Sequence, residues 1–420
     1  MLRLRIQKTN REWLLVVVFY LLMLQNPLSD TLVVVKYTDE LCAVLGCAVF
    51  LYTVLRSGKI RIKKSSAKLC FFLLVFALSG LSGNIIYKYQ PVSVVLTDLL
   101  VNLKFFMSIL TGYLLFSYCG SERCRGTLLR HVHFSAVVFF IFLILDQLFH
   151  IFPSPEVRYG LRVSPLFYKH PTHLAGTMVF LLAIMMMFQD ARNRKYIAMC
   201  LLILCFTLRG KALAGAAAYV LIYYFLILQR KRLKMWHIAL FAIVALVIGW
   251  DQLQFYYVDL GGRSARSVMT QTSFVIMKDY FPIGTGFGTY ASQSAGDFYS
   301  PVYVKYGFLD IYEVSNTGGA FFSDTFWPII IGQTGAIGLC AYLASLLLLY
   351  LRIFRIRKVN TPAYAMGIFV LIYLMISSTS EPAFNNVIAN PLAVALGYII
   401  SQEKHGVIHV VNNPFSEGNV

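Results

Sequence analysis

Five arginines could do chemistry, because they lie in segments otherwise poor in cations that border apolar stretches: Arg158, Arg162, Arg209, Arg263 and Arg266. A guanidinium stays charged at any working pH, and its planar fork of N–H donors matches phosphate or carboxylate oxygens. If the chain is locally helical, Arg158 and Arg162 share one face, and so do Arg263 and Arg266. These arginines predict a site for a phosphate-bearing ligand. Salt bridges to nearby acids are the structural alternative.

Asp324 is the best candidate for a general base, because it lies beside Trp327 at the edge of an apolar stretch. Alternatively, Ser323 and Asp324 could cap the helix that follows.

Lys211, two residues after Arg209, is a further candidate for binding the substrate. Tyr303 and Trp327 belong to an aromatic-rich segment, which suits stacking on sugar rings and equally suits a loop lying on a membrane surface.

The same stretch argues against nucleotide and metal sites. Gly284, Gly286 and Gly288 follow a proline, and no strand pattern precedes them, so they indicate a tight turn rather than a nucleotide-binding loop. No two aspartates stand two residues apart, so an Asp-x-Asp metal site is not predicted. The eight cysteines lack the spacing of a zinc site or a disulfide framework. We therefore expect no metal and no cofactor.

The elements that must position these residues are membrane helices. Hydrophobic residues make up 58% of the chain and charged ones 13%, and the mean hydropathy is +0.67. Apolar runs near the ~20 residues that span a bilayer recur along the sequence. They predict an all-α integral membrane protein with about twelve spans, at 12–32, 39–55, 69–87, 92–118, 134–150, 172–189, 196–208, 212–228, 236–250, 326–351, 363–378 and 386–401.

The distribution of cations predicts the topology. Runs of Lys and Arg fall in every second connection, as the positive-inside bias requires, at 3–11, 56–68, 123–130, 192–195, 230–234 and 352–358. The net charge of +18 therefore reflects topology, and nucleic-acid binding is not expected. With both termini cytoplasmic, residues 1–420 form a single polytopic domain. It has one long outward (periplasmic) loop at 251–325 and a cytoplasmic tail at 402–420.

Three stretches together resemble a known family. They are Leu208–Leu213 at the start of a span, Arg266 followed by Pro282–Tyr290, and Ser323–Trp327 leading into Gly332–Gly338. Their order and placement are similar to the O-antigen polymerase and ligase superfamily, and within it most resemble the Wzy-type polysaccharide polymerases. The resemblance covers the whole chain in architecture, but its motifs lie between Arg209 and Gly338.

The resemblance implies a GT-C-like, metal-independent glycosyltransferase of the bacterial inner (cytoplasmic) membrane. Its donor and acceptor would be oligosaccharides on undecaprenyl diphosphate, polymerised into O-antigen, capsule or exopolysaccharide, with a chain-length regulator as a further candidate partner. Arg209 and Arg266 match the family's diphosphate-binding arginines, and Arg158, Arg162 and Arg263 would support them. The carboxylate of Asp324 would deprotonate the acceptor.

Two alternative functions remain open. Ligases of the superfamily, which transfer the glycan to lipid A core or protein, carry a histidine near the position that Asp324 occupies, and this chain departs from them there. A polysaccharide flippase should carry charges through several spans and show a repeat relating its halves. The sequence shows neither feature.

Overall fold

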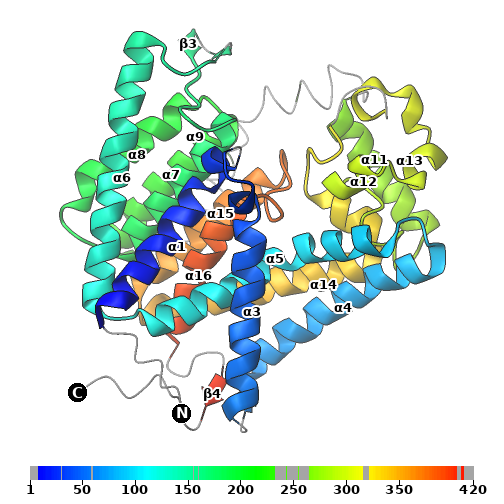
Figure 1. Ribbon diagram of the computed structural model, residues 1–420, viewed down its shortest axis with the longest axis horizontal. Coiled ribbons are helices and arrows are strands. Elements are labelled where there is room, and N and C mark those ends of the chain that lie inside the picture. Colours follow the sequence, from blue (N-terminus) through cyan, green and yellow to red (C-terminus); the bar gives the residue numbers. More distant parts are fainter. Residues whose placement is uncertain are drawn as a thin grey trace.

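Apolar helices dominate the computed structural model of the protein (Figure 1). The structure describes residues 8–29, 31–57, 60–154, 156–158, 160–231, 264–315, 321–403 and 408–410, with the single positions 243 and 254. The helices of the first half are α1 (Lys8–Leu28), α2 (Val33–Lys36), α3 (Thr38–Ser57), α4 (Lys64–Tyr87), α5 (Val92–Tyr118), α6 (Glu122–Phe149), α7 (Pro171–Met187), α8 (Asn193–Phe206) and α9 (Gly210–Ile222), which continues as the π-helix η1 (Tyr223–Leu228). Those of the second half are α11 (Ala265–Asp279), α12 (Gln293–Asp297), α13 (Pro301–Lys305), η3 (Phe308–Asp310), η4 (Tyr312–Val314), α14 (Trp327–Arg355), η5 (Ile356–Lys358), α15 (Thr361–Ser377) and α16 (Ala389–Ser401).

Six helices in the described part of the chain are long and apolar enough to cross a membrane: α3, α4, α5, α6, α9 with η1, and α14 with η5. The protein is therefore a multi-pass membrane protein. The helices α7, α15 and α16 are apolar but shorter. At 1.5 Å per residue, the 17 residues of α7 extend about 26 Å. The predicted span at 236–250 lies outside the described residues, apart from position 243.

The helices form two groups that α5 connects (Figure 1). In the first group α7 packs on α8 and α15, α9 packs on α15, and α1 packs on α6. In the second group α4 packs along α14, which also carries α11. The helix α5 packs along α16 of the first group and along α3. This arrangement brings the start of α9 and the segment before α14 to the same end of the molecule.

Two short antiparallel strand pairs depart from the all-helical expectation. The strand β1 (Ile60–Ile62) pairs with β4 (Ile408–Val410), and β2 (Val157–Arg158) pairs with β3 (Leu161–Arg162). In the second pair Arg158 is opposite Leu161 and Arg162 is opposite Val157. Because neighbouring strand residues face opposite sides, the two arginines point away from each other. The shared helical face considered for them is therefore wrong.

The segment between η1 and α14 forms a small folded insertion where the structure describes it. Its centre is aromatic: Tyr290, Tyr303 and Phe308 are fully buried, and Phe322 stacks on Tyr303. The backbone N–H of Ala291 donates to the hydroxyl of Tyr303 over 2.9 Å. Tyr303 thus stabilises the insertion from within, and its ring is not presented to a ligand.

The insertion is fastened to α14 through main-chain contacts. Gly335 interrupts α14 with a φ of +60°, a backbone conformation that glycine adopts without steric cost. Carbonyls of the preceding turn accept hydrogen bonds from the insertion: Thr285 N–H donates to Gly332 O over 3.0 Å, and Gly286 N–H donates to Gln333 O over 2.8 Å. The glycine-rich segment is therefore a tight turn packed on a helix kink, in agreement with its sequence.

Candidate active site

Arg266 and Asp324 form the first element of the site. Arg266 lies in the first turn of α11. Ser264 caps the N-terminus of this helix, because its hydroxyl accepts a hydrogen bond from Ser267 N–H. The Nε of Arg266 donates to Asp324 Oδ2 over 2.8 Å. The residue before α14 is Phe326, and no side chain caps that helix. Asp324 therefore serves as the partner of Arg266, and the alternative that it caps α14 is not supported.

Glu156 forms the second element, because it bridges two of the predicted arginines. Arg209 immediately precedes α9, and its Nη2 lies 2.5 Å from Glu156 Oε2. The other carboxylate oxygen, Oε1, lies 2.6 Å from Arg158 Nη2 on the β2–β3 hairpin. One carboxylate thus holds guanidinium groups from two separate segments.

Lys211 and Glu381 form the third element. The ammonium lies 2.9 Å from Glu381 Oε2, and the two side chains are only 11% and 8% exposed. Glu381 belongs to the connection between α15 and α16. Its second oxygen, Oε1, is buried and has no hydrogen-bond partner among the described residues, as is true of the hydroxyls of Tyr373 and Ser377. The site therefore contains buried polar atoms with unused hydrogen-bonding capacity.

His170 lies beside these pairs, at the residue before α7. The N–H of Thr172 donates to its Nδ1 over 3.2 Å, and its Nε2 lies 3.3 Å from Arg209 Nη2. Partial burial, together with the charges of Arg209 and Lys211, lowers the pKa of His170 to about 4. The ring is therefore neutral at neutral pH. Arg209 and Thr172 N–H can both only donate, and a neutral imidazole has one acceptor nitrogen, so only one of these two contacts is a hydrogen bond in a given tautomer.

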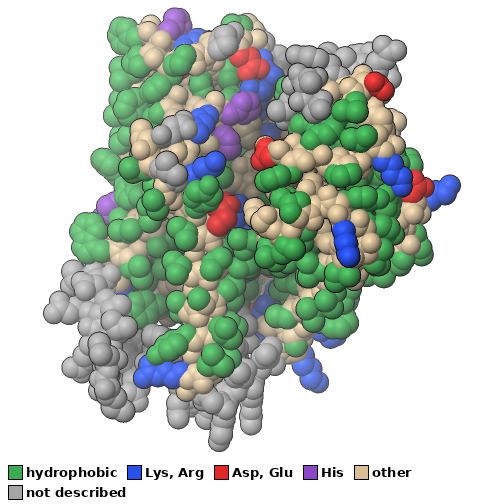
Figure 2. All heavy atoms as spheres, turned by 45° about the vertical axis from the view of Figure 1, so that its right-hand side comes forward, with side chains coloured by type: hydrophobic (Ala, Val, Ile, Leu, Met, Phe, Trp, Pro, Cys, Tyr) green, Lys and Arg blue, Asp and Glu red, His purple; other side chains and the backbone are tan. Residues whose placement is uncertain are grey.

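These elements form one electrostatic neighbourhood. The ammonium of Lys211 interacts with the charges of Arg209 and Arg266 as well as with Glu381. His170 interacts with Arg209, Lys211, Glu156 and Arg158. Histidine, cationic and acidic side chains gather around the hollow in the face shown in Figure 2.

The described ion pairs of this neighbourhood join four cations to three carboxylates. Among the described residues that pair here, the cations are Arg158, Arg209, Lys211 and Arg266, and the carboxylates are Glu156, Glu381 and Asp324. An excess of cations in a partly buried site attracts anions, and the guanidinium groups favour phosphate oxygens. The arrangement is suited to bind a phosphorylated ligand beside carboxylates that can accept a proton.

The remaining predicted residues lie elsewhere or at the margin. Arg162 contacts the side chain of Asp146 at 3.2 Å and the carbonyl of Phe152, so it fastens the hairpin to the end of α6. Trp327 donates through Nε1 to Ser378 Oγ at 3.0 Å, which places it near the segment that carries Glu381. Arg263 lies outside the described residues.

Three residues of the site received little or no weight from the sequence: Glu156, His170 and Glu381. Glu156 and His170 flank the arginine-bearing outer segment, and Glu381 follows an apolar stretch, so the only signal was their position at predicted span ends. Among the described residues, no group of three or more His, Cys, Asp or Glu side chains could hold a metal ion.

Neither a family model nor a curated protein matches the chain.

Proposed function

We propose that the protein is a glycosyltransferase of the bacterial inner membrane that polymerises undecaprenyl-diphosphate-linked oligosaccharide units into O-antigen, capsule or exopolysaccharide. The observation that carries this proposal is the convergence of Arg158, Arg209, Lys211 and Arg266 from three distant segments. A diphosphate that departs from a sugar develops negative charge, and preorganised guanidinium and ammonium groups stabilise it. The sequence motifs around Arg209 and Arg266 support the same assignment.

In the proposed reaction, a hydroxyl oxygen of the acceptor sugar attacks the anomeric carbon of the donor. The bond from that carbon to the diphosphate oxygen breaks, and its electron pair leaves with the lipid diphosphate. The proton of the attacking hydroxyl passes to a carboxylate, for which Asp324 is the first candidate. No oxidant, reductant or further co-reactant is needed.

The ion pairs give the site a defined way to respond to its substrate. Each cation that would hold the diphosphate is paired with a carboxylate. A diphosphate that takes over the guanidinium of Arg266 would release Asp324 from it. The base would therefore become available when the donor is in place.

The proposed orientation puts this site at the periplasmic face. It rests on the alternating cation runs, with about twelve spans in a GT-C-like arrangement and both termini in the cytoplasm. In that orientation the lipid-linked units would be polymerised after they reach the outer leaflet. Donor, acceptor and the bilayer itself would be the partners of the protein.

The direct test is polymerisation by the purified Arg266→Ala variant, with a lipid-diphosphate-linked repeat unit as both donor and acceptor. We expect at least about a 100-fold loss of polymer, the size of effect seen when one stabilising donor is removed from a transition state. Arg192→Ala is the matched control, because Arg192 pairs with Asp190 in the α7–α8 connection and lies outside the site. A full-length ladder from Arg266→Ala would overturn the proposal.

Deletion of the gene separates the proposal from its rivals. A strain without a polymerase should keep single repeat units on its surface glycolipids. A strain without a ligase should accumulate polymer on the lipid carrier, and a strain without a flippase should retain units that face the cytoplasm. Either of these two results would replace the proposed function.

A further inference from the structure

A pocket with a polar and an apolar wall lies at the opposite end of the first helix group from the candidate active site. It has a volume of about 590 Å³ and is formed by α1 and the beginning of α6, with the lining residues Glu12, Trp13, Tyr20, Arg123, Thr127, Arg130, His131 and Phe134. Asp146, which holds the β2–β3 hairpin, is about 35 Å further along α6 from Arg123 at 1.5 Å per residue. The pocket and the site are thus separated by roughly the thickness of a bilayer.

The polar wall of the pocket is a continuous set of contacts between the two helices. Glu12 Oε1 lies 2.6 Å from Arg123 Nε, and its Oε2 accepts a hydrogen bond from the Thr127 hydroxyl over 2.9 Å. Arg130 Nη2 in turn donates to Thr127 Oγ1 over 3.1 Å. Glu12 neutralises one guanidinium, and Arg130 has no carboxylate partner among the described residues. One positive charge therefore remains available to an anion.

The apolar wall of the pocket continues toward the middle of the helices. Trp13 and Phe134, which line it, are 60% and 63% exposed, as are many other apolar side chains of the long helices. Arg123, Thr127, Arg130 and Phe134 follow one another at helical spacing and share one face of α6. From Arg123 to Phe134 the helix rises about 16 Å, which is about half of a bilayer's apolar thickness. The face is therefore cationic at its start and aromatic about half a bilayer further along.

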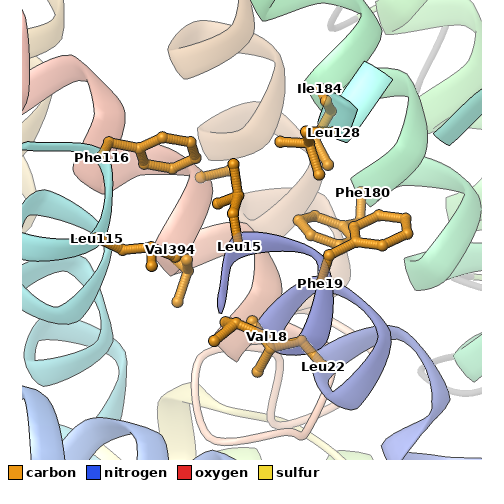
Figure 3. Close-up of a pocket in the computed structure, with 11 residues that line it drawn as sticks. Leu15, Val18, Phe19, Leu22, Leu115, Phe116, Leu128, Phe180, Ile184 and Val394 are labelled. Carbon is orange, nitrogen blue, oxygen red and sulfur yellow. The ribbon is translucent and has the colours of Figure 1, made fainter. Parts of the chain in front are cut away.

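The other face of α1 has a different environment. There Leu15, Val18, Phe19 and Leu22 point into an apolar crevice of about 20 Å³ whose other walls come from α5, α6, α7 and α16 (Figure 3). That crevice is too small and too apolar for a charged ligand. The packed face holds α1 against its neighbours, so its outer face is the one available to a ligand.

We propose that the outer pocket binds one anionic phospholipid. The phosphate would accept hydrogen bonds from Arg130 and Arg123, and an acyl chain would lie along Trp13 and Phe134. A soluble phosphate would use only the polar wall, whereas a phospholipid would also contact Trp13 and Phe134, so the lipid accounts for more of the pocket. The inference does not depend on the proposed glycosyltransferase activity.

The test is lipid binding to the purified full-length protein in detergent, followed by native mass spectrometry during titration with dioleoyl phosphatidylglycerol or dioleoyl phosphatidylcholine. We expect one phosphatidylglycerol to bind in preference to phosphatidylcholine. A basic residue near an anionic lipid surface changes affinity about five-fold, so Arg130→Ala should weaken binding by about that factor and Arg123→Ala/Arg130→Ala by more. Arg130→Lys should retain most of it.

Two controls make the result decisive. Arg192→Ala removes one exposed positive charge outside the pocket and should bind phosphatidylglycerol like the parent. Phe134→Ala should weaken the binding of phosphatidylglycerol and leave the binding of glycerol phosphate, which has no acyl chain, unchanged. Equal affinity for the two lipids, equal binding by Arg192→Ala and the double variant, or tight binding of inorganic phosphate without lipid preference would each overturn the proposal.

Discussion

Arg266 and Asp324 lie 58 residues apart in the chain, and their side chains meet over 2.8 Å. This ion pair joins the start of α11 to the segment that enters α14, so it closes the insertion near its two ends. The side chains are 16% and 31% exposed, and a pair of this kind contributes about 1 kcal/mol or less to stability. A large effect of its removal would therefore point to function rather than folding.

Exchange of the two residues separates these roles. The Arg266→Asp/Asp324→Arg variant should restore the ion pair and keep the thermal midpoint in detergent close to that of the parent. Polymer formation should remain at least about 100-fold reduced, because the guanidinium no longer faces the other cations. If the exchange restores polymerisation as well as stability, the pair is structural only.

Asp324→Asn tests the base directly, because the amide keeps the shape of the side chain but cannot accept the proton. We expect polymerisation to fall by about 100-fold to 10,000-fold, with little change in binding of the lipid-linked donor. Asp297→Asn is the matched control within the same insertion, since Asp297 is exposed and accepts a hydrogen bond from the neighbouring Gln293. Equal activity of the two variants would exclude Asp324 as the base.

The effects on stability of replacing Lys211 and of replacing Glu381 should be strongly non-additive. Lys211→Met leaves a buried carboxylate unpaired, and such a change typically destabilises a protein by about 3–5 kcal/mol. The double variant Lys211→Met/Glu381→Leu removes both charges and should be more stable than Lys211→Met alone. Chemical denaturation in detergent measures the difference. Additive effects of the two single changes would contradict the pairing.

The lowered pKa of His170 predicts that the folded protein loses stability in acid. Its pKa is lowered from 6.5 to about 4 in the folded protein, so the unfolded chain binds a proton more readily between these pH values. The free energy of unfolding therefore falls as the pH is lowered through this window and is unaffected by His170 above it. His170→Gln should lose less stability than the parent between pH 7 and pH 4, as measured by thermal midpoints. Parallel curves for the two proteins would contradict this assignment.

Gly335 should be intolerant of a side chain. A Cβ atom there would lie 2.5 Å from the backbone nitrogen of Gly284, and the positive φ is unfavourable for alanine. Gly335→Ala should cost roughly 1–3 kcal/mol or displace the insertion. Gly126→Ala is the matched control, because nothing lies within 4 Å of its added atom. A parent-like thermal midpoint for Gly335→Ala would show that the kink is adaptable.

The positions of most helices could be predicted from hydropathy, whereas their ends could not. The predicted span 92–118 coincides with α5. In contrast, α6 begins at Glu122 and not at 134, because Ser121 caps the helix and its first turns are polar. Hydropathy marks the part of a helix that suits lipid, and a helix that continues into the aqueous boundary is longer than that part.

The cations of the site could be predicted from the sequence, whereas the acidic and histidine side chains that contact them could not. Arginines in segments that are otherwise poor in cations stand out in the sequence alone. The positions of Glu156, His170 and Glu381 matter only because folding brings them to those arginines. Tyr303 illustrates the reverse: aromatic composition cannot distinguish a ring that faces a ligand from one that fills the core of an insertion.

The attachment of the insertion at the α14 kink limits which part of the insertion can move. Residues 284–288 are fixed on three sides, by Gly332 and Gln333 of α14, by Asn84 of α4, and by Asp98 of α5. A movement of this segment would break hydrogen bonds of its backbone N–H groups to three helices at once. The ion pairs of the candidate site, in contrast, can exchange partners without the loss of backbone hydrogen bonds. Under the proposed function, a growing glycan would therefore displace these side-chain contacts before it displaced the glycine turn.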